Sequence, residues 1–209
     1  MAEESAPTAV HDPVRVTDVH IADALVALEL PELGAAGRVA DLGAGAGLPG
    51  LVLAVALPAA EVILVESAAR KCEFIARAIE ALELANAGVV CARAEAWDEG
   101  IGTCDVVCAR ALAALPVLCE YAAPLLREGG SLVAWKGQID AAEEADAHAA
   151  AEVLGLDPVK VLSVQPYRGS ERHTLHVYRK ASPTPPGYPR RPGIATKRPL
   201  AAEIRRPRR

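Results

Sequence analysis

A run of alternating glycines, GAGAG at residues 43–47, constrains the fold of this chain more than any other part of its sequence. A short apolar stretch, residues 38–42, leads directly into it, and the apolar residues 48–58 follow. Because glycine lacks a Cβ atom, the backbone of such a loop can take positive φ and come close to a ligand. Pro49 suits the first turn of a helix. The sequence therefore predicts a strand, a ligand-binding loop and a helix in direct succession.

The alternation of apolar strands and helices continues beyond this loop. The predicted strands are 38–42, 61–66, 87–92, 103–110 and 129–137, and the predicted helices are 48–58, 67–84 (capped by Ser67), 111–126 (interrupted by Pro116) and 141–155. Almost wholly apolar strands separated by helices form a parallel sheet covered on both faces. Residues 159–167 and 172–180 alternate with a period of two around a Gly-Ser turn, which predicts an antiparallel hairpin at the sheet edge. The expected fold is α/β: a doubly wound, mostly parallel, Rossmann-like sheet with a closing antiparallel hairpin.

The two ends of the chain differ from this central part. Residues 17–30 place apolar side chains along one face, so we expect residues 1–37 to form an N-terminal helical segment before a main domain at 38–180. Residues 181–209 are rich in proline and hold eight Lys and Arg against one Glu, although the whole chain has a net charge of −5. Such a composition favours a mobile basic tail that buries no core, attached to an acidic body.

Several classes of protein are disfavoured by composition. The start of the chain carries acids where a signal peptide needs a basic and then an apolar region. The uncharged stretch 43–60 contains four glycines and two prolines, which suits a buried unit better than a membrane span. Five cysteines without a CxxC pair predict neither a zinc site nor a disulfide framework. We therefore expect a cytoplasmic protein that binds no metal and no membrane.

Two cofactors compete for the glycine loop. Gly45-x-Gly47-x-x-Gly50 matches the dinucleotide fingerprint, and Glu66 lies 21 residues past Gly45, where a ribose-binding acid belongs. Asp41, two residues before the first glycine, instead suits the cationic amino-acid end of S-adenosylmethionine. Ala94 and Glu95 follow the third strand, where they could meet an adenine edge. These flanking residues favour S-adenosylmethionine.

Longer motifs resemble one family. VADLGAGAGLPGLVLAV, LVESAARKCEFI, CARAEAW, CDVVCARALAAL, LVAWKGQ, ERHTLHVYRK and YPRRPGIATKRPL, in this order, resemble the bacterial RsmG (GidB) family. The likeness runs from about residue 20 to residue 200. It implies a class I S-adenosylmethionine-dependent methyltransferase that modifies N7 of a guanine in 16S rRNA, near the decoding centre. It also implies 16S rRNA or a 30S assembly intermediate as the partner, and we expect a monomer.

The resemblance also implies site residues. Gly43 and Leu48 should line the cofactor, Ala94 and Glu95 should contact the adenine, and Arg110 should complete the site. The glycine loop itself adds Gly45 and Gly47 to the expected cofactor residues, and Glu66 as the acid that could bind the ribose. The His20–Ala24 segment is similar to a His-Ile-x-Asp-Ser segment of relatives, which usually have several more helical turns before it. A guanine N7 carries no proton at neutral pH, so no general base is required and no catalytic residue is assigned.

An acidic body needs local basic groups to bind RNA. The candidates are Lys136, Arg172, His173, Arg190, Arg191, Lys197 and Arg198, together with the arginines at 205, 206, 208 and 209. The tail could instead be only a solubilising charged end. Aromatic residues make up 3% of the chain, so base-stacking partners are few, and Trp135 and Tyr188 are the nearest candidates.

Three alternatives remain open at this point. The first is a methyltransferase of the same fold with another acceptor, such as a small molecule. The second is an NAD(P)-dependent oxidoreductase, and the third is a non-catalytic RNA-binding protein that kept the fold.

Overall fold

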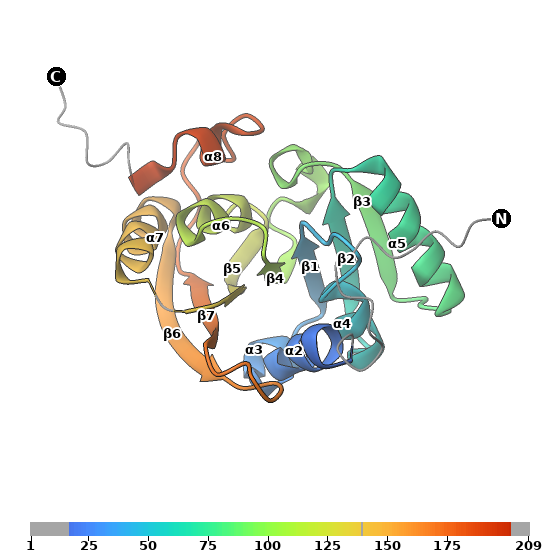
Figure 1. Cartoon of the computed structure of the whole chain (residues 1–209). Helices are drawn as coiled ribbons and strands as arrows, with labels where there is room; N and C mark the ends of the chain where they lie inside the picture. Colours follow the sequence, from blue (N-terminus) through green and yellow to red (C-terminus); the bar gives the residue numbers. More distant parts are fainter. Residues whose placement is uncertain (1–16, 139, 202–209) are drawn as a thin grey trace, which may run out of the picture.

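A seven-stranded sheet lies at the centre of the computed structural model, which describes residues 17–138 and 140–201 (Figure 1). The strand order is β3-β2-β1-β4-β5-β7-β6. Strands β1 to β5 are parallel, and β7 pairs antiparallel with both β5 and β6, so the predicted sheet and hairpin are confirmed. The strands are β1 (Arg38–Leu42), β2 (Glu61–Glu66), β3 (Ala87–Cys91), β4 (Cys104–Arg110), β5 (Leu126–Lys136), β6 (Leu156–Val164) and β7 (His173–Lys180).

Helices cover both faces of this sheet, each over its own apolar cluster. One cluster joins the N-terminal helices, α4 and α5 to the sheet, and the other joins α6, α7 and α8 to the opposite face. Within the described residues, no helix is long and apolar enough to span a membrane. The helices are η1 (Thr17–Ala22), α2 (Asp23–Leu25), η2 (Val26–Glu29), α3 (Pro31–Gly34), α4 (Gly50–Ala56), α5 (Ala69–Ala81), η3 (Ala94–Ala96), η4 (Asp98–Gly100), α6 (Leu115–Ala122), α7 (Ala141–Leu154) and α8 (Ile194–Lys197).

The carboxyl ends of the five parallel strands meet at one edge of the sheet. The chain order runs outward from β1 in both directions, towards β2 and β3 on one side and towards β4 and β5 on the other. A crevice outside the carboxyl ends at such a reversal is where doubly wound sheets bind ligands. The fold therefore places the glycine loop, which follows β1, at the expected ligand edge.

The N-terminal segment is helical from Thr17 to Glu29 as predicted, but it is not one regular helix. A π-helical turn (η1), a short α-helical turn (α2) and a 3₁₀ turn (η2) follow one another. The backbone then becomes extended at Leu30, with φ −83° and ψ 122°. This break precedes Pro31, and a proline disfavours helical geometry in the residue before it. Pro31 opens α3, a turn that the periodicity did not predict.

Two predicted helix starts were wrong. Ser67 does not cap α5, which begins at Ala69 with Ala68 in the N-cap position, because the Ser67 hydroxyl and N–H both face the Glu66 carboxylate. Likewise α6 is not a helix over 111–126 with a kink. It begins at Leu115 with Pro116 in its first turn, where proline is tolerated, and residues 111–114 form a loop.

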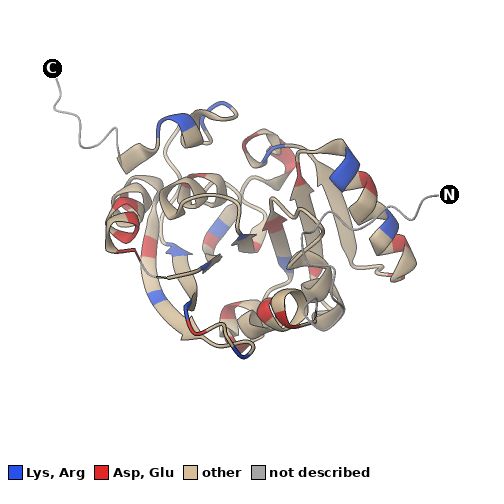
Figure 2. Ribbon diagram, viewed as in Figure 1, with Lys and Arg blue, Asp and Glu red and all other residues tan. Residues whose placement is uncertain are grey.

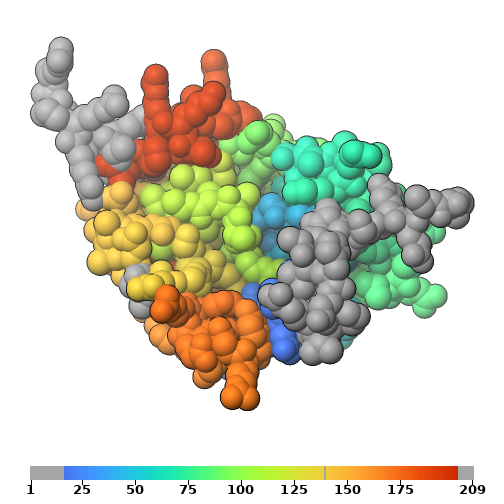
Figure 3. Space-filling view, in the orientation of Figure 1, coloured from blue at the N-terminus to red at the C-terminus, as the bar shows by residue number. Residues whose placement is uncertain are grey.

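The tail was predicted to bury no core, and its described part contradicts this. Residues 181–201, here called the C-terminal arm, run over α6 and form α8 (Figure 3). Three apolar side chains of the arm, Ala195, Leu200 and Ala201, are buried. The arginines at 205, 206, 208 and 209 lie outside the described residues.

Candidate functional site

The glycine loop is shaped by backbone conformations that favour glycine. Gly43 has φ +67° and Gly47 has φ +87°. A Cβ atom on Gly43 would lie 2.5 Å from Leu112 Cδ1, and one on Gly47 would lie 2.4 Å from Leu51 Cδ1. The positive φ values disfavour residues with a Cβ at these positions, and an added Cβ would also displace the side chain of Leu112 or Leu51.

Asp41 lies beneath this loop. It is buried, and its Oδ2 accepts a hydrogen bond from Gly50 N at 2.8 Å, which satisfies an N–H of the first turn of α4. Burial raises the pKa of the Asp41 carboxyl to about 7. Its Oδ1 has no hydrogen-bond partner among the described residues. Asp41 lines neither of the two pockets described below, so its clearest role is to hold the loop and α4 together.

Glu66 connects the loop to the end of β2. Its Oε2 accepts from Gly45 N at 3.0 Å, and its Oε1 accepts from Ser67 N at 2.7 Å and Ala68 N at 2.9 Å. Lys71 Nζ lies 3.9 Å from Oε2. The side chain is 8% exposed, so the carboxylate is fixed mainly by backbone N–H groups at the carboxyl edge.

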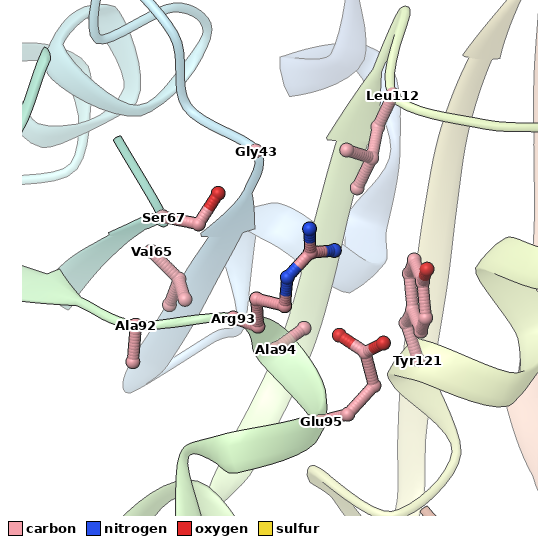
Figure 4. A pocket seen from close by; sticks show the side chains of 9 residues that line it. All are labelled: Gly43, Val65, Ser67, Ala92, Arg93, Ala94, Glu95, Leu112 and Tyr121. Carbon is pink, nitrogen blue, oxygen red and sulfur yellow. The ribbon is translucent and has the colours of Figure 1, made fainter. Parts of the chain in front are cut away.

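The first pocket opens beside Gly43, between the ends of β2 and β3, the loop after β4 and the last turn of α6 (Figure 4). Glu95 is the only acidic residue among those that line it, and Leu112 and Tyr121 provide flat apolar walls. Its lining residues are Gly43, Val65, Ser67, Ala92, Arg93, Ala94, Glu95, Leu112 and Tyr121.

This pocket brings together three of the predicted cofactor residues, namely Gly43, Ala94 and Glu95. Gly45, Gly47 and Leu48 belong to the same loop but line neither pocket. Three other lining residues, Arg93, Leu112 and Tyr121, were not predicted from the sequence. Arg93 could have been found, because it directly precedes the predicted Ala94-Glu95 pair. Tyr121 gives no such signal, because its helix comes from a distant part of the chain.

The second pocket is built around Asp23. Its Oδ2 pairs with Arg110 Nη1 at 2.8 Å, and its Oδ1 lies 2.9 Å from His173 Nδ1. Its carbonyl oxygen accepts from Trp135 Nε1 at 2.8 Å. The lining residues are Asp23, Arg110, Ala111, Ala113, Trp135, Lys136, Gly137 and His173.

Three predicted residues therefore lie together in the second pocket, namely Arg110, Lys136 and His173. Lys136 is held by an ion pair, with its Nζ 2.7 Å from Glu143 Oε1. Arg110 forms its ion pair with Asp23 of the predicted His-Ile-Ala-Asp segment. The central place of Asp23 was not predicted, because its partners lie 87 and 150 residues away in sequence.

The two pockets adjoin through one loop. Leu112 lines the first pocket, whereas its neighbours Ala111 and Ala113 line the second. Ala111 has φ +53°, which is unusual for a residue other than glycine and marks a tight turn directly after β4. A ligand in the first pocket and a ligand in the second would meet at this turn.

The predicted RNA-binding residues divide into two groups. Arg190 is engaged, since its Nε and Nη2 lie 2.6 Å and 2.5 Å from the carboxylate oxygens of the buried Glu120. Arg172 of the hairpin and Arg191, Lys197 and Arg198 of the C-terminal arm are exposed. The ribbon in Figure 2 carries Lys and Arg positions on the arm, whereas Asp and Glu positions lie on α7.

Comparison with known proteins decides between the interpretations of the loop. A family model described as "rRNA small subunit methyltransferase G" (GidB) matches residues 3–175. The chain belongs to this family. The ribosomal RNA small subunit methyltransferase G of Rubrobacter xylanophilus is 45% identical over 195 residues, which cover 90% of this chain and 75% of that protein. The protein of the same name from Desulfitobacterium hafniense is 37% identical over 92% of this chain and 81% of its own length.

The methyltransferase G family assignment confirms the resemblance and favours the methyltransferase interpretation over the dinucleotide one. The fold agrees. A SAM-dependent methyltransferase from Aquifex aeolicus matches with a TM-score of 0.62 at 15% identity, over 81% of this chain and 94% of that chain. Geranyl diphosphate C-methyltransferase from Streptomyces coelicolor, solved with S-adenosyl-L-homocysteine, matches with a TM-score of 0.60 at 16% identity. The match covers 77% of this chain and 78% of that chain. The fold is that of class I methyltransferases.

Proposed function

We propose that this chain transfers the methyl group of S-adenosylmethionine to N7 of a guanine in 16S rRNA, near the decoding centre. The substrate is the RNA itself or a 30S assembly intermediate. The observation that carries the proposal is the pair of adjoining pockets at the carboxyl edge. One holds the carboxylate of Glu95 with Arg93 beside apolar side chains, and the other gathers three basic side chains around Asp23.

The first pocket fits an adenosine. Glu95 offers an acceptor for the exocyclic amine of adenine, and Ala94, Leu112 and Tyr121 provide apolar surface for the ring. Glu66 lines neither pocket, but its Oε2 accepts from Gly45 N of the glycine loop, and from this contact we assign its carboxylate to the ribose hydroxyls. The loop with Gly43, Gly45, Gly47 and Leu48 would hold the amino-acid portion. When bound, S-adenosylmethionine supplies an electrophilic methyl group on a positively charged sulfur.

The second pocket fits the acceptor base. Its Arg110 can donate to guanine O6, the acceptor beside N7 in the major groove, while the N7 lone pair stays free to attack. As the N7–CH₃ bond forms and the S–CH₃ bond breaks, the positive charge passes from sulfur to the guanine ring, so no proton has to move. The residues of the pocket therefore act by orientation, which can supply about 7–11 kcal/mol of the barrier. Asp23 orients both Arg110 and His173.

RNA docking is assigned to the exposed cations around these pockets. Arg172, Arg191, Lys197 and Arg198 can contact phosphates, and Lys136 and His173 lie closer to the base. Phosphate contacts of this kind provide affinity and register but do not read the sequence. Arg190 is proposed to support the C-terminal arm through Glu120 instead of contacting RNA.

The test is transfer of labelled methyl groups. The full chain is incubated with methyl-labelled S-adenosylmethionine and either unmodified 16S rRNA or 30S particles, and the RNA is digested to nucleosides. Label in 7-methylguanosine supports the proposal, and label in another nucleoside rejects the N7 assignment. Arg110→Lys should reduce transfer strongly, since Lys cannot reproduce the fork geometry of Arg. Arg77→Lys, an equivalent change on the exposed side of α5, is the matched control.

A further inference from the structure

The C-terminal arm is anchored to α6 by an ion pair and by apolar packing. Arg190 forms a two-pronged ion pair with Glu120, and Glu120 is 1% exposed. Arg190 Nη2 also donates to the carbonyl oxygen of Arg198 at 2.8 Å, which ties the two ends of the α8 segment together. Farther along, Ala195 and Leu200 join the apolar cluster beneath α6. The arm is therefore held in one place along its described length, next to the first pocket.

From this place the arm contacts two residues of the first pocket. Gly193 N donates to Glu95 Oε1 at 2.8 Å, and the hydroxyl of Thr196 lies 3.0 Å from that of Tyr121. Glu95 and Tyr121 lie on different elements, η3 and α6, and both side chains point into the pocket (Figure 4). Their arm partners are only three residues apart in sequence. A single turn of the arm thus bridges two opposite walls of the pocket.

The local geometry explains why Gly193 is suited to this contact. Gly193 precedes α8 with φ +81°, a backbone conformation that L side chains rarely adopt. This conformation turns its N–H towards Glu95. Because Oε1 is occupied by Gly193, the carboxylate is restrained in rotation, and its second oxygen is left for a donor on a ligand.

We propose that Gly193 and Thr196 are positioning residues of the cofactor site, which hold Glu95 and Tyr121 in the geometry that binds adenine. The inference rests on the proposed function in one respect, namely that the adenosine lies in the first pocket. Neither arm residue touches the reacting atoms. Their loss should therefore weaken cofactor binding and leave the rate at saturating cofactor unchanged.

The test is calorimetric titration of the full chain with S-adenosylhomocysteine. Gly193→Pro removes the N–H donor and also displaces the turn, because proline cannot adopt φ +81°, so the Kd should rise about tenfold or more. Thr196→Val removes one neutral hydrogen bond and should raise the Kd by about threefold. The matched control is Thr184→Val, which removes a hydroxyl that the same arm uses to contact Lys180 and which lines neither pocket. Unchanged Kd values in both Gly193→Pro and Thr196→Val would overturn the proposal.

A double-mutant cycle keeps the test valid if Gly193→Pro fails to fold. If Thr196 acts through Tyr121, the variant Thr196→Val/Tyr121→Phe should bind S-adenosylhomocysteine no more weakly than Tyr121→Phe alone. Fully additive effects would show that Thr196 does not act through Tyr121 and would contradict the proposal. In steady-state assays, Thr196→Val should raise the KM for S-adenosylmethionine and leave kcat unchanged. An equal loss of kcat would indicate a general structural role instead.

The two proposals fail differently. Binding of S-adenosylhomocysteine needs no RNA, so a wrong acceptor base would leave these titrations as expected. If the adenosine does not lie in the first pocket, Glu95→Gln should leave the Kd for S-adenosylhomocysteine unchanged. That result would overturn both proposals. A normal response to Glu95→Gln with none to the arm variants would overturn only the positioning role.

Discussion

The two pockets at the carboxyl edge differ in how the chain builds them. The first follows largely from two short motifs, the glycine loop after β1 and the Ala94-Glu95 pair after β3, to which Leu112 and Tyr121 are added from farther along the chain. The second gathers Asp23, Arg110, Trp135 and His173 from four separate segments around one carboxylate. Short motifs can reveal a pocket of the first kind. A pocket of the second kind becomes visible only when the fold has brought its parts together.

The two pockets also differ in what holds their side chains in position. In the first pocket, backbone conformation does most of the positioning, as the positive φ of Gly43 and the N–H groups around Glu66 show. In the second, a buried charge holds other charges in place, and removing one partner leaves the rest unpaired. We therefore expect the pockets to respond to different substitutions and to affect different steps.

Gly43→Val should have the largest effect, and it should act on the first pocket. The new Cβ would lie 2.5 Å from Leu112 Cδ1 at a backbone position with φ +67°. We expect binding of S-adenosylhomocysteine to weaken by more than about 100-fold, about 3 kcal/mol or more. Calorimetric titration measures this directly.

Gly34→Ala is the control for this variant, because nothing lies within 4 Å of the added Cβ and its φ is not in the left-handed range. Binding by Gly43→Val within tenfold of the unaltered chain would show that the loop does not approach the cofactor.

The sheet was predictable to the same degree as the first pocket. The apolar runs at 38–42 and 61–66 became β1 and β2 with the predicted bounds, since near-continuous apolar character is a local property of buried parallel strands. Helix starts were less predictable. Ser67 has the residue type of an N-cap, but its hydroxyl faces the carboxylate of the preceding residue, Glu66, a specific side-chain contact that cap propensity does not contain.

Asp23→Asn should have the next largest effect, and it should act on the second pocket. The change keeps the shape of the side chain but removes the charge that orients Arg110 and His173. We expect kcat/KM for the RNA substrate to fall about 100-fold, or about 3 kcal/mol, with the affinity for S-adenosylhomocysteine changed less than about twofold. Methyl-transfer kinetics and calorimetry on the same preparation measure the two quantities.

Equal losses of turnover and cofactor affinity in Asp23→Asn would mean that the pockets are not separate in function. Asn is chosen because it has the same shape as Asp. Asp23 is 5% exposed, so a smaller residue would also leave a cavity.

The C-terminal arm shows where composition misled. Its proline and arginine content predicted a tail without a core, yet Ala195 and Leu200 are buried and Arg190 pairs with Glu120. Composition averages over a segment, whereas a few apolar residues at the right spacing are enough to anchor it on a folded body. The partner for Arg190 could not be foreseen, since Glu120 lies on the buried side of α6, 70 residues earlier.

The exposed cations of the arm should produce a moderate effect on RNA binding. Replacing Arg191, Lys197 and Arg198 together with Ser removes three positive charges that face solvent. We expect the slope of log K against log salt to become less steep by about 2–3, because each phosphate contact contributes about 0.7–0.9. Filter binding at four salt concentrations measures the slope.

Arg179→Ser is the comparison for these cations, since Arg179 is exposed at the end of β7 away from the carboxyl edge. A slope that is the same in the triple variant and in the unaltered chain would place the RNA surface elsewhere.

The smallest expected effect links RNA binding on the arm to the first pocket. If the arm holds Glu95 and Tyr121 through Gly193 and Thr196, RNA bound to its cations should favour the same arm position. We expect saturating RNA to lower the Kd for S-adenosylhomocysteine by about two- to fivefold, and the cofactor to tighten RNA binding by the same factor, because coupling between two sites is reciprocal. Titration with S-adenosylhomocysteine in the presence and absence of RNA measures this coupling.

Thr196→Val should reduce the coupling, since it removes one of the two contacts between the arm and the pocket. Equal Kd values with and without RNA in the unaltered chain would show that the arm supports the pocket but does not transmit RNA binding to it.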